Sequence, residues 1–423
     1  MRLDRLHIKN FRCYEDATFD FQPGFNLVVG VNGSGKSSLL QAAATSFVDF
    51  VAATGKSHIY LQEEDIRFVV DKFEGRSRFE RRFPVVLAAH GRIFDCSSWS
   101  MLRERQDVPF LSDVLLDVEV TDKISNIDKG ISIDLPVLAF YRSDRRWRGV
   151  GVSSEFAASQ RLSRLDGYND WSDAAANLKD FESWVIGKTL ERMQWLLEAG
   201  APLTGRETEL TWINSMISHA VPGATGIRYD LRLQSVMVEF GETRTFPFGD
   251  LSDGQRGMIA LFADIARRMC ILNPHMGKDV LKNTSGVVII DELDIHLHPA
   301  WQRSIVPALR QAFPKVQFIA ASHSPQIIGS LKPEEVIVLH DGDPTHPRVT
   351  YGLDSSSVLE EVMGVTQREP EIEDLLSELF STLEDNDLEK AKSQLEALKK
   401  KAPDLPEFAG AEALIRRKEI LGK

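Results

Sequence analysis

The feature that most constrains this chain is the stretch GVNGSGKS at residues 30–37, the phosphate loop. It fills the pattern G-x-x-x-x-G-K-[ST], in which glycines let main-chain N–H groups approach phosphate oxygens. The apolar run FNLVV at residues 25–29 precedes it, and a helical pattern begins at Ser37. Strand, glycine-rich loop and helix, in this order, form the context in which the motif binds nucleotide phosphates. The sequence therefore predicts an α/β fold built around a nucleotide site.

The residues of the phosphate loop have distinct expected roles. Lys36 should neutralise the β and γ phosphates, and the Ser37 hydroxyl should hold Mg²⁺ at the start of the helix. ATP and Mg²⁺ are the cofactors expected on this basis. The nucleotide-binding candidates in and directly after the loop are Asn32, Gly33, Ser34, Gly35, Lys36, Ser37 and Ser38.

Composition bounds the class of protein. A chain of 423 residues with 43% hydrophobic and 26% charged residues is globular and long enough for roughly two to three domains. Its three cysteines, Cys13, Cys96 and Cys270, stand far apart and form no C-x-x-C pair. Neither a disulfide framework nor a zinc hook is indicated, so a reducing cytoplasm is expected. No run of about 18 apolar residues is present, so no membrane partner is expected.

The charge balance restricts nucleic-acid binding without excluding it. The net charge of −12 argues against a surface that binds nucleic acid over most of its area. Two islands, RSRFERR at residues 76–82 and YRSDRRWR at residues 141–148, interleave basic and aromatic side chains. Each is either a solvated face or a contact for phosphate or nucleic acid. The second is the stronger candidate, because a buried strand over residues 135–141 should deliver it to a sheet edge.

An acidic pair follows a second apolar run. VVII at residues 287–290 predicts a buried strand, and Asp291 and Glu292 come directly after it. Ligands of open α/β sheets bind at the carboxyl ends of the strands. We expect Asp291 to hold Mg²⁺ through water and Glu292 to orient and deprotonate the attacking water. Two solvated acids at a strand end are the alternative, but the phosphate loop upstream favours catalysis.

A histidine follows the next predicted strand, residues 316–320. His323 should therefore lie beside the acidic pair, where it would sense the γ-phosphate. The nearby sequence DIHLHP at residues 294–299 resembles a metal cluster at first sight. A zinc site needs three or four converging ligands, so we disfavour that interpretation.

A second anion-binding element is predicted at LSDGQRG, residues 251–257. A long helix is expected over residues 257–272, ending before Pro274. A helix N-terminus presents unpaired N–H groups and partial positive charge, which attract a phosphate. Its candidate binding residues are Ser252, Gly254 and Gln255.

The order of elements predicts the architecture. Residues 3–90 are strand-rich, residues 153–199 have helical spacing, and a strand pair is expected over residues 227–240. Strands that alternate with helices indicate an α/β core with a mostly parallel sheet. We expect one large α/β domain over residues 1–358, with a helical insertion at about 150–222. A helical region over residues 359–423 should follow.

Taken together, the phosphate loop, LSDGQ, VVIIDE and the late histidine resemble the ABC-type ATPase head of SMC-like, RecF-like and OLD-like proteins. The resemblance covers roughly residues 1–345. It implies a Mg²⁺-dependent ATPase with a central mostly parallel sheet, an antiparallel lobe, a helical insertion and a C-terminal helical extension. It also makes Arg12, after the strand residues IKNF, a candidate nucleotide contact.

The same resemblance implies a dimer. In that family the LSDGQ helix serves the ATP of a partner subunit, so Ser252 and Gly254 would close over the γ-phosphate bound to the other chain's Lys36. The expected assembly is a head-to-tail homodimer, with higher oligomers left open. Two departures stand out: Leu297-His298 replaces the family's usual Leu-Asp, and Gln62 is a weak candidate for its Q-loop glutamine.

The length of chain between the motifs, and the sequence after the last one, indicate which branch of the family this chain resembles. About 210 residues between phosphate loop and LSDGQ are too few for a long coiled-coil arm, and no nuclease constellation follows His323. DELDIHLHPAWQ (291–302), SHSPQII (322–328), LPVLAFYRSDRRW (135–147) and the closing EALIRRKEILGK are similar to stand-alone ATPases of Septu and retron-associated anti-phage systems.

That similarity implies the partners. A separate HNH-type nuclease would bind the ATPase, and the C-terminal helical region is the candidate dock. A retron reverse transcriptase and its DNA/RNA product are further candidates. The alternative function is an SMC/RecF-like DNA-repair or recombination ATPase that clamps DNA itself, and a regulatory nucleotide sensor is a third.

Overall fold

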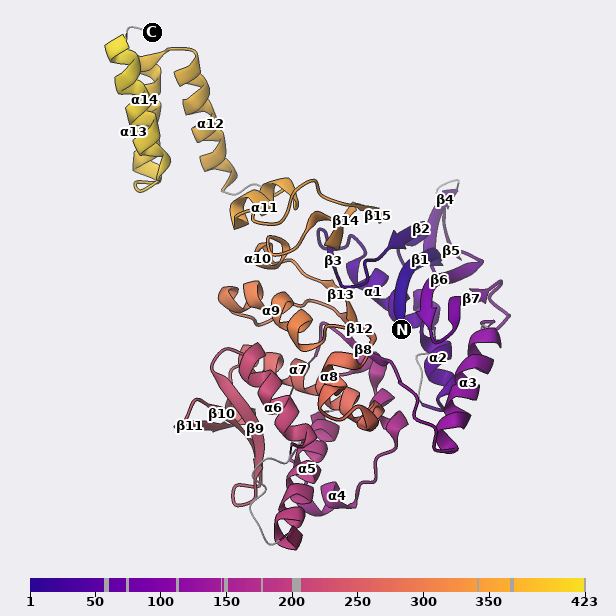
Figure 1. Ribbon diagram of the computed structural model, residues 1–423. Helices are drawn as coiled ribbons and strands as arrows, with labels where there is room; N and C mark the ends of the chain where they lie inside the picture. Colours follow the sequence, from indigo (N-terminus) through magenta and orange to yellow (C-terminus); the bar gives the residue numbers. More distant parts are fainter. Residues whose placement is uncertain are drawn as a thin grey trace. The chain divides into compact units, whose positions relative to one another are not determined.

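The computed structural model describes the chain except residues 57–60, 74–75, 112–113, 146, 148–150, 176–177, 200–206, 341, 366–368 and 422–423. It divides into two compact units, Met1–Leu353 and Asp354–Lys423 (Figure 1). None of the helices in the described residues is long and apolar enough to span a membrane.

The core of the larger unit is a six-stranded sheet in the order β15-β14-β3-β13-β12-β8. Five strands run parallel to one another, and β15 is antiparallel to β14. Every residue of β3, β8, β12 and β13 is buried, as their continuous apolar runs predict. The predicted α/β fold with a mostly parallel sheet is confirmed. The strands are β3 (Phe25–Val29), β8 (Val137–Tyr141), β12 (Gly286–Ile290), β13 (Val316–Ala321), β14 (Val336–His340) and β15 (Asp343–Thr345).

A second, antiparallel sheet forms the predicted antiparallel lobe, with the order β2-β1-β6-β7. Helix α1 (Lys36–Thr45) lies between this sheet and the central one (Figure 1). A separate hairpin, β4 with β5, extends from the same lobe. The other elements of the lobe are β1 (Arg2–Phe11), β2 (Tyr14–Asp20), α2 (Val48–Ala53), η1 (Glu63–Asp65), β4 (Phe68–Phe73), β5 (Arg76–Arg81), β6 (Val85–Ile93), β7 (Cys96–Arg103) and α3 (Val114–Asp128).

Helices and a small three-stranded sheet, in the order β11-β10-β9, follow β8. Helix α5 spans 22 residues and α6 packs against β9. The elements are α4 (Ser154–Ser159), η2 (Arg164–Tyr168), η3 (Trp171–Asp173), α5 (Leu178–Ala199), α6 (Glu209–Ala220), β9 (Ala224–Asp230), β10 (Ser235–Phe240), β11 (Arg244–Pro247) and η4 (Phe248–Asp250).

Helix α7 (Asp253–Leu272) begins four residues before the predicted start at residue 257. The reason is a capping box: Ser252 Oγ accepts a hydrogen bond from the N–H of Gln255, and Gln255 Oε1 accepts one from the N–H of Ser252. This reciprocal pair makes the LSDGQ residues the first turn of the helix. The remaining helices of this unit are η5 (Pro274–Asp279), α8 (Val280–Asn283), α9 (Pro299–Ala312), α10 (Pro325–Ile328) and η6 (Pro333–Glu335).

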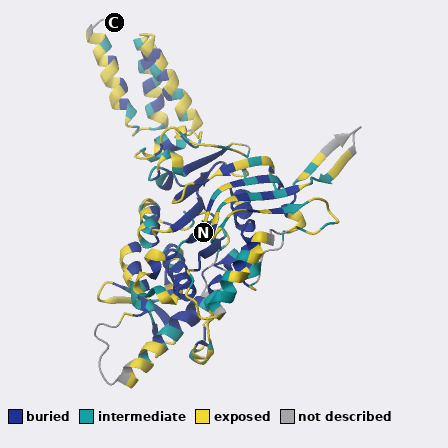
Figure 2. Ribbon diagram, turned by 45° about the vertical axis from the view of Figure 1, so that its right-hand side comes forward, coloured by how far each residue is buried: buried dark blue, intermediate teal, exposed yellow. Residues whose placement is uncertain are grey.

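The smaller unit is helical and has a core of its own. It contains α11 (Ser355–Glu361), α12 (Pro370–Glu384), α13 (Leu388–Lys401) and α14 (Glu407–Leu421). The last three pack their apolar stripes together, and Figure 2 shows these helices with buried and exposed positions along their lengths. The core residues are Leu376, Leu379, Leu383, Ala391, Leu395, Leu398, Phe408, Ala411 and Ile415.

Candidate functional site

The phosphate loop joins the end of β3 to α1, and two of its glycines require their residue type. Gly33 and Gly35 have φ angles of 84° and 104°, in the left-handed region. A Cβ on Gly35 would lie 2.7 Å from the hydroxyl oxygen of Tyr14 and 2.9 Å from Cys13 Sγ. The Tyr14 hydroxyl donates to the Gly35 carbonyl oxygen at 3.0 Å. The turn after β1 therefore supports the loop from one side.

The polar side chains of the loop fit a phosphate ligand. Lys36 Nζ donates to the carbonyl oxygens of Gly30 and Val31, both at 2.9 Å, so the ammonium group folds back over the loop. The buried hydroxyl of Ser34 has no hydrogen-bond partner within the described part of the chain. A buried polar group without a partner is costly, and a phosphate oxygen would satisfy it. Asn32 and Gly33 are exposed at the tip.

Asp291 and Glu292 lie at the carboxyl end of β12, one strand beyond β13 from the phosphate loop. The Asp291 N–H donates to the Tyr141 carbonyl oxygen of β8 at 2.8 Å, and Asp291 is 5% exposed. Glu292 is exposed, and its N–H donates to Asp291 Oδ1 at 3.1 Å. The Leu293 N–H donates to the Ala321 carbonyl oxygen at 2.8 Å, which ties this turn to β13.

His323 follows β13 and lies near the acidic pair. The Ser322 hydroxyl and the His323 N–H both donate to Asp294 Oδ1, at 2.5 and 3.3 Å. Partial burial and the charge of Lys36 lower the pKa of His323, while Asp294, Glu292 and Asp291 raise it. The net direction is downward, so the ring is neutral at pH 7.

The charges of these groups act on one another. Burial lowers the pKa of Lys36, and the carboxylates of Asp291, Glu292 and Asp294 act in the opposite direction. The structure therefore brings Lys36, the acidic pair and His323 together at one edge of the sheet. Asp291 and the exposed Ser37 hydroxyl offer oxygen ligands of the type that Mg²⁺ takes alongside phosphate oxygens and water.

Arg12 lies in the turn after β1, next to the residues that contact the phosphate loop. Its Nε donates to the buried carboxylate of Asp65 at 2.8 Å, and its N–H donates to the Asp65 carbonyl oxygen. The Gln62 N–H donates to the other carboxylate oxygen of Asp65 at 3.0 Å. Arg12 is thus held beside the loop by Asp65.

The start of α7 forms a separate hollow. A Cβ on Gly254 would lie 2.4 Å from the carbonyl oxygen of His296, so only glycine fits there. Within the described residues, Ser252 and Gln255 bond to each other and not to the phosphate loop. The open hollow measures about 500 Å³ and is lined by Ser252, Asp253, Gly254, Gln255, His296, His298 and Trp301.

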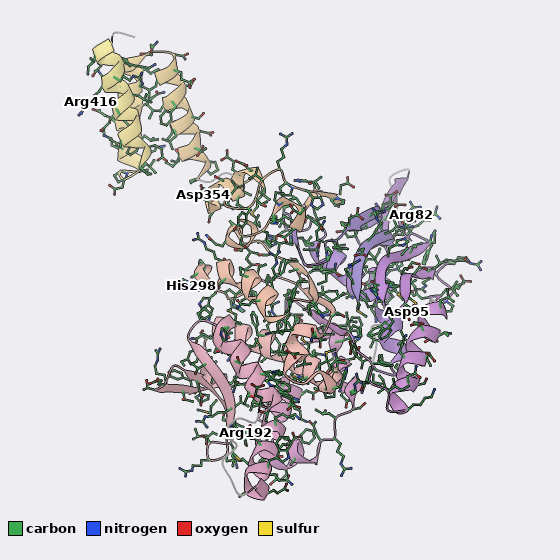
Figure 3. The ribbon with its side chains drawn as sticks, in the orientation of Figure 1. Arg82, Asp95, Arg192, His298, Asp354 and Arg416 are labelled. Atoms are coloured by element: carbon green, nitrogen blue, oxygen red, sulfur yellow. The ribbon has the colours of Figure 1, made fainter. Side chains whose placement is uncertain are left out.

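One histidine of DIHLHP, His298, has a local structural role. His298, which is labelled in Figure 3, accepts a hydrogen bond at Nδ1 from the Ala300 N–H at 3.2 Å and caps α9. Asp294 is engaged by Ser322. In the ranges that the structure describes, no group of three or more His, Cys, Asp or Glu side chains could hold a metal ion.

One residue at the site was missed from the sequence. Arg145 belongs to the basic island 141–148, which we expected to be either a solvated face or a contact for phosphate or nucleic acid. Its guanidinium instead donates to the carbonyl oxygens of Asp291 and Glu292, with the second at 2.7 Å. The sequence signal for Arg145 was its place directly after a buried strand. The sequence did not indicate that this strand lies beside the one that carries Asp291 and Glu292. Arg146 and Arg148 lie outside the described residues.

Comparisons with known proteins agree with these features. A family model described as "AAA domain, putative AbiEii toxin, Type IV TA system" matches residues 25–329, which include the phosphate loop, α7, the acidic pair and His323. The retron Ec83 probable ATPase of Escherichia coli is 24% identical over 434 residues, covering 88% of this chain and 78% of that protein. The Septu protein PtuA of Bacillus mycoides is 42% identical over 106 residues, covering 25% of this chain and 14% of that protein.

A second retron relative and a solved structure complete the comparison. The retron Vc95 probable ATPase of Vibrio cholerae is 24% identical over 396 residues, covering 81% of this chain and 74% of that protein. An SMC head bound to the C-winged helix domain of ScpA has 15% identity and a TM-score of 0.46, covering 82% of this chain and 97% of that one. The relatives confirm the predicted resemblance to retron-associated and Septu ATPases.

Proposed function

Because this chain belongs to the family of AAA domains described as putative AbiEii toxins of type IV toxin–antitoxin systems, we propose that it is the ATP-hydrolysing subunit of an anti-phage defence complex. The chain is an ATPase, as its family and its relatives named as ATPases indicate. The defence role is inferred from the retron and Septu relatives.

The observation that carries the proposed mechanism is the convergence of Lys36, Glu292 and His323 at one sheet edge. Glu292, exposed and on a fixed turn, orients the attacking water and takes its proton. Lys36 balances charge on the β and γ phosphates, and the neutral His323 ring contacts the γ-phosphate. Ser37, and Asp291 through water, would hold Mg²⁺, which would supply positive charge to the phosphates.

The proposed assembly is a head-to-tail homodimer with ATP between the heads. The hollow at the start of α7 supports it, because Ser252 and Gly254 present a helix N-terminus that, among the described residues, has no hydrogen bond to the chain's own phosphate loop. ATP would then join two heads, and hydrolysis would release them.

Glu292→Gln tests this assembly. Removing the base should trap ATP and give a stable dimer at micromolar concentration, which analytical ultracentrifugation with ATP and Mg²⁺ would detect. Ser252→Arg in the same background should leave ATP bound but keep the protein monomeric. An ATP-loaded Glu292→Gln protein that stays monomeric would contradict the proposed dimer with ATP between its heads.

The proposed partner is a separate HNH-type nuclease that docks on the helical unit Asp354–Lys423. This unit supports such a role because it has its own core and exposes Leu414 and Ile420 on α14, the latter 83% exposed. A retron reverse transcriptase with its DNA/RNA product is a second candidate partner, by analogy with the retron relatives.

Affinity purification of Glu292→Gln with ATP, followed by mass spectrometry, separates the candidate functions. A stoichiometric nuclease would support the defence complex. The alternative is a repair-type ATPase that clamps DNA itself, supported only by the basic islands and opposed by the net charge of −12. Recovery of DNA without a protein partner would favour that alternative.

A further inference from the structure

The turn that carries the acidic pair is held from the side by one arginine. Arg145, in the loop after β8, donates from Nη1 to the carbonyl oxygen of Asp291 and from Nη2 to that of Glu292. A guanidinium is planar and presents its N–H groups in a rigid fork. Two consecutive carbonyl oxygens bridged by one fork cannot rotate independently. Arg145 therefore fixes the orientation of this peptide segment.

Glu292 needs such support because its backbone is unfavourable. Its φ angle is 47°, in the left-handed region that residues with a Cβ rarely occupy. Such conformations persist only where the surroundings over-determine them, and they cluster at functional sites. The Ile295 N–H also donates to the Glu292 carbonyl oxygen at 3.0 Å. Of these two donors to Glu292, Arg145 is the one contributed by a distant segment of the chain, the loop after β8.

The other hydrogen-bond partner of the Arg145 side chain is also a main-chain group. Its third hydrogen bond, from Nη1 at 3.0 Å, goes to the carbonyl oxygen of Arg142. These bonds, the ones found among the described residues, go to main-chain carbonyl oxygens, although Asp291, Glu292 and Asp294 are close enough to act on its charge. Arg145 holds backbone shape rather than pairing with one carboxylate.

We propose that Arg145 is a positioning residue for ATP hydrolysis, which fixes the turn at Glu292 so that its carboxylate faces the attacking water. The inference rests on the proposed function, in which Glu292 is the base. Arg145 touches neither water nor phosphate in this role and acts only through Glu292. Arg145 also lines a cavity of about 30 Å³ with Trp147 and Gly257, near the start of α7.

Arg142 is a matched control from the same loop. Its Nε donates to the Ser172 carbonyl oxygen at 3.1 Å, and its guanidinium lies 5.6 Å from the Phe140 ring centre. It is partly buried and loses a comparable hydrogen bond when truncated, but among the described residues its side chain has no hydrogen bond to the acidic turn.

The first experiment measures turnover and ATP affinity separately. Arg145→Ala should lower kcat about 10- to 100-fold, because a small misplacement of a general base has effects of this size. Its Kd for ATP should stay within about threefold of the wild type, because in the proposed role Arg145 acts on the turn at Glu292 and not on ATP. Arg145→Lys keeps the charge but can reach only one carbonyl oxygen. Its kcat should lie between those of the wild type and Arg145→Ala. Arg142→Ala should retain wild-type kcat.

A double-mutant cycle tests whether Arg145 acts through Glu292. In a Glu292→Gln background, Arg145→Ala should change the single-turnover rate less than about twofold, because the base is already absent. Independent effects would multiply, and that result would overturn the inference. So would wild-type kcat in Arg145→Ala, or a Kd for ATP that rises in proportion to the loss of kcat.

Two further readings keep the outcomes distinct. If Arg145→Ala fails to fold by calorimetry, the same cycle is run with Arg145→Lys, and multiplying effects there overturn the inference. Wild-type turnover in Glu292→Gln alone would refute the proposed mechanism. An inactive Glu292→Gln with a fully active Arg145→Ala would refute only the role of Arg145.

Discussion

The hydroxyl of Tyr141 donates a 2.8 Å hydrogen bond to the carboxylate of Asp264 and thereby joins the last residue of β8 to the middle of α7. Burial raises the pKa of Tyr141 well above its usual value, so the phenol remains a donor. Asp264 is also paired with Arg267 and Arg268 at 2.7 Å, and all three are buried. Helix α7, which Ser252 caps, is therefore anchored to the strand next to the one that carries the acidic pair.

Tyr141→Phe should lower the free energy of unfolding by about 1.5–3 kcal/mol, because it removes a buried hydrogen bond to a charged acceptor. Chemical denaturation monitored by circular dichroism measures the loss. Tyr168→Phe is the comparison: its hydroxyl donates at 2.8 Å to the neutral carbonyl oxygen of Pro136, so a smaller loss of about 1 kcal/mol is expected. An equal or smaller loss for Tyr141→Phe would mean that Asp264 is satisfied by its arginines alone.

Gly254→Ala should abolish ATP-dependent dimerisation and reduce turnover at least about tenfold, because a Cβ there would lie 2.4 Å from the backbone oxygen of His296. The start of α7 must shift to relieve that contact. Gly249→Ala, five residues earlier, is the control, because a Cβ there meets nothing within 4 Å. Sedimentation with ATP and a phosphate-release assay measure both effects. Equal dimerisation and turnover in the two variants would show that the α7 N-terminus is not part of the dimer contact.

The fold was more predictable than the contacts within the site. Continuous apolar runs predicted the buried strands, and motif order placed Lys36, Asp291 and His323 at strand ends, because parallel strands share a carboxyl edge. The partners of Arg145 and Asp65 were not predictable. Both bonds join residues far apart in the chain, and neither strand order nor turn geometry is encoded in a local pattern.

The pKa of His323 leads to a pH-dependent prediction. Because it lies below the usual value of about 6.5, the unfolded chain binds a proton at higher pH than the folded one does. Stability associated with the neutral ring is present above about pH 6.5 and is lost as pH falls toward the lowered pKa.

Urea denaturation of wild type and His323→Gln between pH 5 and pH 8 measures this effect. The difference in unfolding free energy between the two proteins should be constant above about pH 6.5, and the wild type should lose stability relative to the variant below that pH. If the wild type instead gained stability relative to the variant on acidification, the carboxylates of Asp291, Glu292 and Asp294 would have the larger effect on the pKa of His323.

Leu379→Ala should loosen the unit Asp354–Lys423 without affecting ATP hydrolysis. Leu379 is fully buried among Leu376, Leu383 and their partners, and its truncation leaves a cavity that costs about 2–5 kcal/mol. Leu414→Ala is the matched control, because Leu414 is 38% exposed on α14. In the full-length protein, limited proteolysis should cleave the Leu379→Ala unit faster, and ATPase assays should give equal kcat for both variants. A fall in kcat in Leu379→Ala alone would show that the core of this unit contributes to turnover.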